Sequence, residues 1–332
     1  MIKIAIDAMG GDYAPKEQVE GAVMAIKNIE DIELTLYGDE VEIRKYLTDE
    51  TRITIVQSDG VISMGEKDPI AQIRGNRKSS MALALSSVRS GDNSAIVSSG
   101  ATQALIAGAH ILVGRLKQMK RTAIAPLIPR TDGGTTILLD AGGNLEIKPE
   151  FMVQQAYFAQ VYSKEVLNVE NPKLGLLNIG TEPGKGRQLD KEVFKLFTDN
   201  EKINFIGNIE SKEILSPPCD ILISDGFTAN MVMKTIVGTA KGMGQMLKQE
   251  LKQGFFGKLG MLLSARNLKR FKYRLNPEEI GGAMIYGLKG VVVKAQGSST
   301  NVGFYNAIKV AAIIVRKDVL NKVKTILESD VL

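Results

Sequence analysis

Polar, glycine-rich turns recur along this sequence, and each directly follows a short run of apolar residues. The turns begin at Asp7, Ser98, Asp140, Gly180, Asp225 and Gln296. Free backbone N–H groups at helix starts, together with glycines that allow close approach, form binding sites for anions. The turns therefore predict a site for phosphate or another compact anion.

The turn Gly180-Thr181-Glu182-Pro183-Gly184-Lys185-Gly186 has the composition of a phosphate-binding P-loop but not its spacing. A P-loop needs four residues between its glycines and a Ser or Thr after the Lys, whereas here three residues separate Gly180 from Gly184 and a glycine follows Lys185. An ordinary nucleoside triphosphatase is therefore disfavoured. The first strand also ends without GxGxxG, which removes the best support for a dinucleotide site. Lys185 is either an anion ligand or a solvated loop lysine.

Aspartate and asparagine side chains in these turns have useful chemistry. Asp7, Asp140 and Asp225 each follow a strand, so they either gather around Mg²⁺ or cap helices and brace turns, and the second interpretation is favoured. We therefore expect no metal site. Asn144 and Asn230 carry amide groups that could donate hydrogen bonds to an oxyanion.

The single histidine and the single cysteine limit the chemistry of the chain. One His excludes a metal site built from several histidines, and one Cys excludes an intrachain disulfide or a CxxC knuckle. His110 lies in an apolar helical run, so we expect a core residue rather than a general base. Cys219 has no neighbouring His or Lys to activate it, so we expect it to be inert.

The composition is typical of a folded globular protein: the 332 residues are 44% hydrophobic and 24% charged. The N-terminus lacks the long apolar core of a signal peptide, so we predict a cytoplasmic protein. The net charge of +5 is unevenly distributed. Residues 241–275 hold nine basic residues and one acidic residue, a net charge of +8, which leaves −3 for the rest of the chain.

The same basic segment is amphipathic. Its apolar residues include Phe255, Phe256, Leu259 and Leu262, and its cations include Lys258, Arg266, Lys269 and Arg270. A basic amphipathic helix suits an anionic membrane surface or an acidic partner protein. A helical hairpin whose apolar face packs in a dimer is the alternative, and the sequence leaves both open. Nucleic acid is not expected as a partner, because aromatic residues make up 5% of the chain, Trp is absent and no nucleic-acid-binding motif occurs.

Short apolar runs alternate with segments of helical periodicity. Strands are predicted at 2–6, 33–37, 53–56, 95–97, 136–139, 174–178, 204–206, 221–224 and 291–294. Helices are predicted around 19–26 and at 79–88, 102–113, 150–166, 188–198, 227–250 and 302–316. This alternation favours an α/β fold with a mostly parallel sheet covered by helices on both faces. We predict one domain over 1–332 with a helical protrusion at about 241–278.

Several motifs occur in an order that identifies a family. They are Asp7-Ala8-Met9-Gly10-Gly11-Asp12, Asp140…Gly142…Asn144, Leu176-Leu177-Asn178-Ile179-Gly180, Glu182…Lys185-Gly186, Asp225-Gly226-Phe227…Asn230 and Gly297-Ser298-Ser299. Each motif alone is weak, but the collinear set resembles the phosphate acyltransferases of bacterial phospholipid synthesis over nearly the whole chain.

The resemblance implies a fold and an activity. The fold would have three layers, helices on both sides of a mostly parallel sheet, as in the isocitrate and isopropylmalate dehydrogenases. The activity would be transfer of a long-chain fatty acyl group from acyl carrier protein to inorganic phosphate, without a cofactor. The resemblance also implies a homodimer, peripheral membrane association, and a glycerol-3-phosphate acyltransferase that consumes the acyl phosphate.

The resemblance further implies roles for individual residues. Lys185 and Asn230 would be catalytic, one holding phosphate and the other donating to the oxyanion or orienting the acyl group. Substrate-binding residues would be Asp7, Gly10, Gly11, Ser99, Asn144, Thr181, Gly184, Gly186, Asp225, Ser298 and Ser299. Phosphate is already an anionic nucleophile at neutral pH, so the reaction needs no serine or histidine. Positioning and oxyanion stabilisation would then supply the catalysis.

The chain departs from the family pattern near the expected site. The family usually has Asn-Thr-Gly in place of Ala101-Thr102-Gln103, His in place of Gln296, Gly in place of Ala229 and Ala in place of Gly143. Two other functions therefore stay open. One is a catalytically weakened, membrane-docked scaffold of the same fold. The other is a metal-dependent dehydrogenase or short-chain phosphotransacylase on the same architecture.

Overall fold

The computed structural model describes residues 1–274 and 280–329 of the chain. In those ranges the strands are β1 (Ile2–Asp7), β2 (Ile32–Gly38), β3 (Ile53–Gln57), β4 (Ala95–Ser98), β5 (Ala123–Ala125), β6 (Leu127–Pro129), β7 (Thr135–Leu139), β8 (Leu174–Asn178), β9 (Phe205–Glu210), β10 (Ile221–Ile223), β11 (Ala283–Tyr286) and β12 (Val291–Lys294). The α-helices are α1 (Lys16–Asn28), α2 (Glu40–Arg44), α3 (Pro69–Gly75), α4 (Ser80–Ser90), α5 (Thr102–Gly108), α6 (Pro149–Val166), α7 (Gln188–Thr198), α8 (Gly226–Leu251), α9 (Gly254–Leu263), α10 (Ala265–Arg274), α11 (Asn301–Arg316) and α12 (Val319–Ser329).

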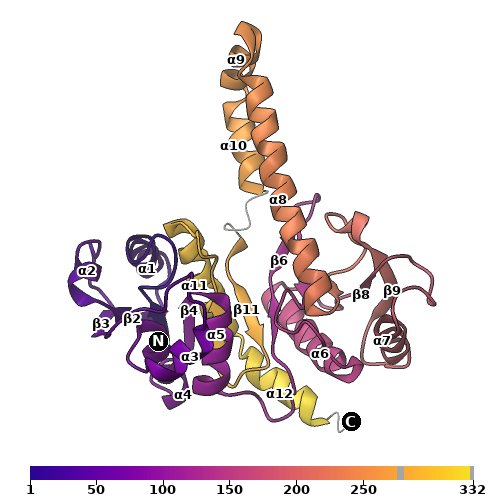
Figure 1. The fold of residues 1–332 in the computed structure, drawn as a ribbon, viewed down its shortest axis with the longest axis horizontal. Helices are drawn as coiled ribbons and strands as arrows, with labels where there is room; N and C mark the ends of the chain where they lie inside the picture. The colour runs from indigo at the N-terminus through magenta and orange to yellow at the C-terminus, as the bar shows by residue number, and fades with distance from the viewer. Residues whose placement is uncertain (275–279, 330–332) are drawn as a thin grey trace.

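The strands form two sheets that lie side by side, each with its own helices (Figure 1). We call the two halves the first and second lobes. The first sheet has the order β3-β2-β1-β4-β12-β11-β5, and the second has the order β6-β7-β10-β8-β9. Within the first sheet β11 is antiparallel to both neighbours, and within the second β6 is antiparallel to β7. The other pairs are parallel.

The prediction of an α/β fold with mostly parallel strands and packed helices is confirmed. All nine predicted strands and all seven predicted helices occur within a few residues of their expected ends. The expected single sheet is wrong, because β5 and β6 are separated by Pro126 alone and the extended chain leaves one sheet there to join the other. A proline has no N–H group to donate to a sheet ladder, so this is a natural place for the change. That the chain is a single domain remains a prediction.

The helix predicted over 102–113 is interrupted. It continues from α5 into a π-helical turn, η1 (Ala109–Val113), whose C-terminal residue is followed by Gly114 with a φ of 87°. π-Helical turns are rare and frequently mark functional positions. Here the wider turn carries His110 at its second position, and the chain then enters the loop that leads to β5.

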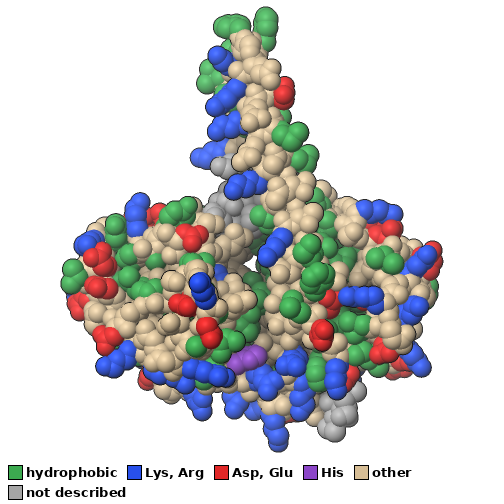
Figure 2. Space-filling view, in the orientation of Figure 1, with side chains coloured by type: hydrophobic (Ala, Val, Ile, Leu, Met, Phe, Trp, Pro, Cys, Tyr) green, Lys and Arg blue, Asp and Glu red, His purple; other side chains and the backbone are tan. Residues whose placement is uncertain are grey.

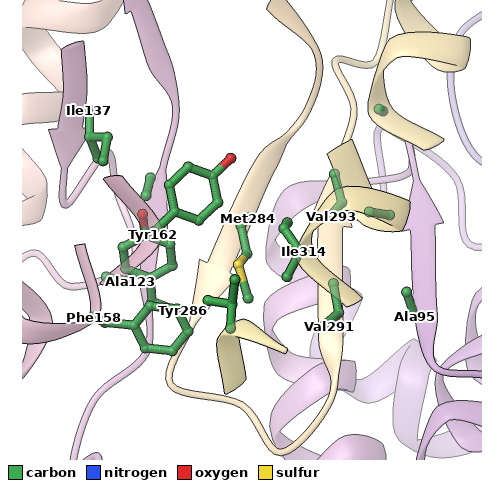
Figure 3. Packing of buried hydrophobic residues seen from close by; sticks show 14 of the residues in the cluster. Ala95, Ala123, Ile137, Phe158, Tyr162, Met284, Tyr286, Val291, Val293 and Ile314 are labelled. Atoms are coloured by element: carbon green, nitrogen blue, oxygen red, sulfur yellow. The ribbon is translucent and has the colours of Figure 1, made fainter. Parts of the chain in front are cut away.

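One hydrophobic cluster spans both lobes and joins them (Figure 3). Phe158 and Tyr162 of α6 pack against Tyr286 of β11, with ring centroids 4.2 Å and 5.7 Å apart. Phe158 and Tyr286 are fully buried. Because α6 belongs to the second lobe and β11 to the first sheet, this aromatic contact fixes the lobes against each other.

Helices α8, α9 and α10 extend away from both lobes (Figure 1). Of the 26 residues of α8, only Gly226 and Ala229 near its start are buried. Apolar side chains are exposed along the rest, and Figure 2 shows them with Lys and Arg side chains on this extension. The predicted protrusion ended at about residue 278, so its last four residues lie outside the described part of the chain. Among the described helices, none is long and apolar enough to cross a membrane.

The aromatic contact between the lobes yields a test of the core. Phe158→Ala removes a buried ring and should lower the free energy of unfolding by about 3–5 kcal/mol. Phe256→Ala is the matched control, since that ring is 84% exposed on α9 and its loss should change stability by less than about 0.5 kcal/mol. Urea unfolding followed by circular dichroism measures both. Equal effects would show that the contact does not carry the predicted energy.

Candidate active site

The carboxyl ends of three strands of the first sheet lie at one level. Asp7 of β1 pairs in register with Ser98 of β4, and Ser98 pairs with Lys294 of β12. The turns that follow these strands therefore meet at one edge. The Asp12 N–H donates to the Gly297 carbonyl at 2.8 Å, which ties the turn after β1 to the turn after β12.

The Asp7 carboxylate is the buried centre of this first cluster. It accepts hydrogen bonds from Ser80 Oγ and Ser98 Oγ, each at 2.6 Å. Burial raises the pKa of Asp7, and the two hydroxyl donors partly oppose that effect. The carboxylate thus joins the start of α4 to the ends of β1 and β4.

The glycines of the turn after β1 are required by close packing. A Cβ at Gly10 would lie 2.4 Å from Asp7 Oδ2, and Gly11 has a φ of 114° that side chains rarely adopt. The Gly10 carbonyl accepts from Ser99 Oγ at 2.7 Å and from Gln18 Nε2 at 2.9 Å. Two turns and helix α1 are therefore locked together beneath these glycines.

Lys294 places a buried ammonium group in the same cluster. Its Nζ donates to the backbone carbonyls of Ser99 and Ala295. Burial lowers the pKa of Lys294 to about 8, against the attraction of Asp7 and Asp12. This cation holds the turn after β4 against the end of β12.

The second sheet has its own cluster, centred on Asp140 after β7. Its carboxylate accepts from the Ile124 N–H at 2.9 Å, from the Gly143 N–H at 2.9 Å and from Asn144 Nδ2 at 2.7 Å. Burial raises the pKa of Asp140 to about 6, and these donors oppose the rise. Since Ile124 belongs to β5, the carboxylate links the second cluster to the edge of the first sheet.

Asp225 begins helix α8 beside this cluster. Its Oδ1 accepts from the N–H groups of Phe227 and Thr228 at 3.1 and 3.0 Å, which caps the helix. Its Oδ2 accepts from the Arg187 guanidinium at 2.5 Å. Burial alone would raise the pKa of Asp225, but Arg187 and the Thr228 donors hold it below the ordinary value. The pair of Asp225 and Arg187 connects α8 to the turn after β8.

Two asparagines fix the turn that carries Lys185. Asn178 Nδ2 donates to the Lys185 carbonyl at 3.1 Å and to Asn208 Oδ1 at 3.1 Å. Asn208 Nδ2 donates to the Glu182 carbonyl at 2.8 Å. The Lys185 side chain is exposed, and its stem lies over Gly180. The backbone of this turn is held from below, which leaves the ammonium group in solvent.

Asn230 lies one turn into α8, against the glycine turn after β7. Its amide nitrogen would be 3.2 Å from a Cβ at Gly142, whose φ is 110°. The Gly226 N–H donates to the Asn144 carbonyl at 2.8 Å, so the start of α8 and this turn are fixed together. Within residues 1–274 and 280–329, no hydrogen bond of the Asn230 amide is found, and the side chain is half-buried.

Both clusters border the segment where β5 passes into β6. Strand β11 is antiparallel to both β5 and β12, so β5 and β12 point in the same direction. The last residue of β5, Ala125, therefore lies at the same edge of the first sheet as Lys294. On the other side, the Ala141 N–H donates to the Ile124 carbonyl and the Leu138 N–H donates to the Pro126 carbonyl. Figure 2 shows the surface hollowed between the lobes. The carboxyl ends of strands in both sheets therefore flank one junction, as expected of ligand sites in α/β folds.

Comparisons with known proteins agree with this arrangement. The family model of the fatty acid synthesis proteins matches residues 2–322. The chain is 49% identical over 329 residues to a phosphate acyltransferase of Acholeplasma laidlawii, covering 98% of each chain. It is 41% identical over 329 residues to a phosphate acyltransferase of Bacillus cereus, covering 99% of each.

The chain belongs to the fatty acid synthesis protein family. Relatives at 41% and 49% identity are named phosphate acyltransferase, so the prediction that the chain is an enzyme of the acyltransferase class is confirmed. Solved structures share the fold at low identity. A phosphotransacetylase from Streptococcus pyogenes has a TM-score of 0.61 at 15% identity, covering 96% of this chain and 94% of that one. A branched-chain phosphotransacylase from Enterococcus faecalis has a TM-score of 0.61 at 16% identity, covering 95% and 99%.

In this protein, some of the predicted substrate-binding residues lie in the first cluster and the others lie in the second. The first cluster holds Asp7, Gly10, Gly11, Ser99, Ser298 and Ser299. The second holds Asn144, Asp225, Thr181, Gly184 and Gly186, together with the predicted catalytic pair Lys185 and Asn230. Ser299 is buried and Ser298 is exposed. No hydrogen bond joins Lys185 to Asn230 among the described residues, so their shared role stays a prediction.

The predicted membrane or carrier contacts are all on the extension. Phe255, Phe256, Leu259 and Leu262 are between 41% and 84% exposed, and the four cations of the same prediction, Lys258, Arg266, Lys269 and Arg270, are also exposed. None of these residues takes part in either cluster. Their contact role is therefore independent of the site geometry and remains a prediction.

Three smaller observations concern His110, Cys219 and possible metal ligands. His110 is half-exposed rather than a core residue, and its Nε2 is 2.7 Å from Thr122 Oγ1. Burial raises the pKa of the Cys219 thiol to about 12, in agreement with an inert cysteine. Among the described residues, no group of three or more His, Cys, Asp or Glu side chains is placed to hold a metal ion.

Sequence reasoning missed several residues that build the site. Lys294 and Arg187 were not predicted, and Ser98 was named only as the start of a turn. Lys294 had a readable signal, since it is the only charge in the apolar run from Val291 to Ala295. Arg187 directly follows the predicted phosphate turn, which ends at Gly186. Gln18 gave no signal, because it meets Ser99 across 81 residues of sequence.

Close packing at the start of α8 yields a matched test. Gly226→Ala would place a Cβ 2.3 Å from the Asn144 carbonyl oxygen, so it should lower the free energy of unfolding by about 1–3 kcal/mol and reduce turnover. Gly238→Ala, on the same helix with nothing within 4 Å, should stabilise by up to about 1 kcal/mol. Denaturant midpoints of the two variants measure the difference. A tolerated Gly226→Ala would contradict the packing.

Proposed function

We propose that this chain transfers a long-chain fatty acyl group from acyl carrier protein to inorganic phosphate. A phosphate oxygen attacks the thioester carbonyl carbon, a C–O bond forms, and the C–S bond breaks. The carrier thiolate leaves and takes up a proton, and the product is an acyl phosphate. We propose that this product is the acyl donor of a glycerol-3-phosphate acyltransferase.

The observation that carries the proposal is the meeting of two turn clusters at one junction between the sheets. One cluster offers closely packed glycine turns above a buried ammonium group, Lys294. The other offers an exposed ammonium group, Lys185, and a half-buried amide, Asn230. A bisubstrate reaction needs both a place for a compact anion and a donor for the developing oxyanion, and the clusters that contain such groups border the same junction.

Lys185 and Asn230 have different tasks in this mechanism. The Lys185 ammonium is solvated and mobile on a rigid turn, which suits a group that captures phosphate and neutralises its charge on approach to the thioester. Asn230 is held by its helix against Gly142, which suits a fixed donor to the carbonyl oxygen as it gains charge. Since phosphate attacks as an anion, no side chain has to remove a proton before bond formation.

The departures from the family pattern support no second function strongly enough to replace this one. Ala101 is 9% exposed at the start of α5, and Gln296 is exposed after β12. Neither contributes to the hydrogen bonds of Asp7, Asp140 or Asp225. The hydrogen bonds of these three carboxylates are present in this chain, including the one that Asp140 accepts from the N–H of Gly143, itself one of the departures.

The activity is tested by mixing the purified protein with an acyl-carrier-protein thioester and phosphate. Lys185→Ala should reduce kcat/KM by about 100-fold or more, with an unchanged melting temperature because the side chain is exposed. Lys191→Ala, a nearby exposed lysine on α7, is the control and should keep wild-type rates. Acyl phosphate is measured by trapping with hydroxylamine.

Absence of acyl phosphate with the wild-type protein would exclude the acyltransferase proposal in favour of a scaffold. Near-normal rates for Lys185→Ala would exclude its role alone. Loss of activity on chelation, or binding of a nicotinamide nucleotide, would instead favour a dehydrogenase.

We further propose that the extension formed by α8, α9 and α10 places the enzyme on an anionic membrane surface as a homodimer. Exposed aromatic rings at Phe255 and Phe256 lie next to exposed lysines, and this combination suits the boundary between headgroups and acyl chains. Such a position would deliver a lipid-soluble product directly to the bilayer.

Replacing both rings with serine tests this role. Phe255→Ser/Phe256→Ser should reduce the affinity for phosphatidylglycerol vesicles, measured by cosedimentation, by about two to three orders of magnitude. About 2 kcal/mol of burial is lost for each ring, and each 1.4 kcal/mol is tenfold in affinity. Val41→Ser is the control, since Val41 is 69% exposed on α2. The rings would instead belong to a dimer interface if the double variant cosediments with vesicles as the wild type does but is monomeric in analytical ultracentrifugation.

A further inference from the structure

A second basic surface lies on the body of the enzyme, apart from the extension. The loop between η1 and β5 contains four cations and no acidic residue between positions 114 and 122. Two more cations, one before β12 and one on α12, lie beside it. We call this set the basic loop surface: Arg115, Lys117, Lys120, Arg121, Lys289 and Lys324, all of them exposed. Figure 2 shows Lys and Arg side chains gathered below the hollow between the lobes.

The loop is rigidly attached to the protein. Leu116 and Met119 are 9% and 2% exposed, so the loop inserts two apolar side chains into the core between its cations. The Leu116 N–H donates to the Gly287 carbonyl at 3.0 Å, and the Arg115 guanidinium donates to the Lys120 carbonyl. The cations therefore project from a fixed backbone, which lowers the entropy cost of binding a partner.

The surface is concave and poorly neutralised. Lys117, Lys289 and Lys324 line a hollow of about 430 Å³. The only acidic side chain in its lining is that of Glu328, whose Oε1 lies 3.9 Å from Lys324 Nζ. Among residues 1–274 and 280–329, the four loop cations form no ion pair. A partner with several carboxylates would meet unpaired positive charge here.

The basic loop is joined to the second cluster through the residue that follows it. The residue after the loop, Thr122, is buried; its carbonyl accepts from Asn144 Nδ2 at 2.5 Å, and its hydroxyl meets His110. The Asn144 carbonyl in turn accepts a hydrogen bond from the N–H of Gly226, the first residue of α8. Asn230 lies one helical turn further along the same helix. Arg121 is therefore the immediate chain neighbour of a residue that is hydrogen-bonded to the second cluster.

The cations at the tip of the extension, such as Lys258 on α9, lie far from Asn230. Helix α8 continues from Asn230 to Leu251, and 21 residues at about 1.5 Å each place its end about 32 Å away. A protein that docks beyond that point would have to deliver its thioester over the whole length of the helix. Distance therefore disfavours the tip of the extension as the place where a substrate-bearing protein binds, whereas the basic loop adjoins the second cluster through Thr122.

We propose that the basic loop surface is the docking site of the acidic carrier protein that delivers the acyl thioester. The proposal rests on the proposed function, since it names the surface that receives the acyl donor. Carboxylates of the carrier would face Lys117, Lys120 and Lys289, and its thioester arm would enter the hollow past Thr122. Charge pairs at the rim of such an interface mainly raise the association rate, and they weaken as salt is added.

The experiment compares a protein-borne donor with a small one. Lys117→Glu/Lys120→Glu should raise KM for the acyl-carrier-protein thioester about tenfold at low ionic strength, with kcat and KM for phosphate unchanged. With acyl-pantetheine, which carries neither protein nor charge, the variant should match the wild type. Lys117→Arg/Lys120→Arg should retain wild-type KM, because the charge is kept.

Two charge-matched variants serve as controls. Lys191→Glu/Lys195→Glu on α7 changes the net charge equally and should leave KM for the carrier unchanged. Lys248→Glu/Lys252→Glu at the end of α8 tests the extension as the rival docking surface, and its KM should also stay unchanged. Circular dichroism melting confirms that each variant is folded.

The proposal is overturned if Lys117→Glu/Lys120→Glu leaves KM for the carrier unchanged, or raises it no more than the α7 control does. It is also overturned if the variant loses binding to anionic vesicles while its carrier KM is normal, because the surface would then serve a membrane. A wild-type enzyme that makes no acyl phosphate even from acyl-pantetheine would instead overturn the proposed function, so the two failures are distinct.

Discussion

The hydrogen bonds to the buried Asp140 carboxylate join the two sheets at the point where the active-site turns meet. This carboxylate accepts a hydrogen bond from the N–H of Ile124 in the first sheet. It also accepts from the Gly143 N–H and from Asn144 Nδ2 in the turn after β7 of the second sheet. A buried carboxylate without such donors would be costly, so the bonds hold both partners in place. The hydrogen bond to Asp140 fixes Asn144, and the Asn144 carbonyl fixes the start of α8 by accepting from the Gly226 N–H. Asn230 is therefore placed by a chain of contacts that begins at one side chain.

The fold was largely predictable from local patterns, and its failures have a physical cause. Long amphipathic segments such as α6 and α11 were predicted because their periodicity extends over several turns. Strands β5 and β6 have three residues each, too few for any alternation to be recognised. Yet these two strands decide that there are two sheets, because the chain passes between the sheets at Pro126. The architecture thus depends on the segments with the weakest local signal.

The site was predictable in its turns but not in the contacts beneath them. Glycines after apolar runs located the turns that hold Gly10, Gly142 and Gly186. The groups that lock those turns come from far away in sequence: Ser80 reaches Asp7 over 73 residues, and Arg187 reaches Asp225 over 38. Such partners carry no local pattern, since a serine or arginine at a helix start has many ordinary uses.

The chain keeps its positive charge on two surfaces that differ in what surrounds the cations. On the extension, cations alternate with exposed rings such as Phe256, so the surface can bind only a partner that offers both negative charge and an apolar phase. On the basic loop surface, Leu116 and Met119 are largely turned into the core, and the exposed side chains that line the hollow are charged or polar. A folded acidic protein presents carboxylates without free hydrocarbon, and it is matched by the second arrangement. Because the two surfaces lie on different parts of the molecule, the two proposed contacts, with a membrane and with an acyl-carrying protein, do not compete for the same residues.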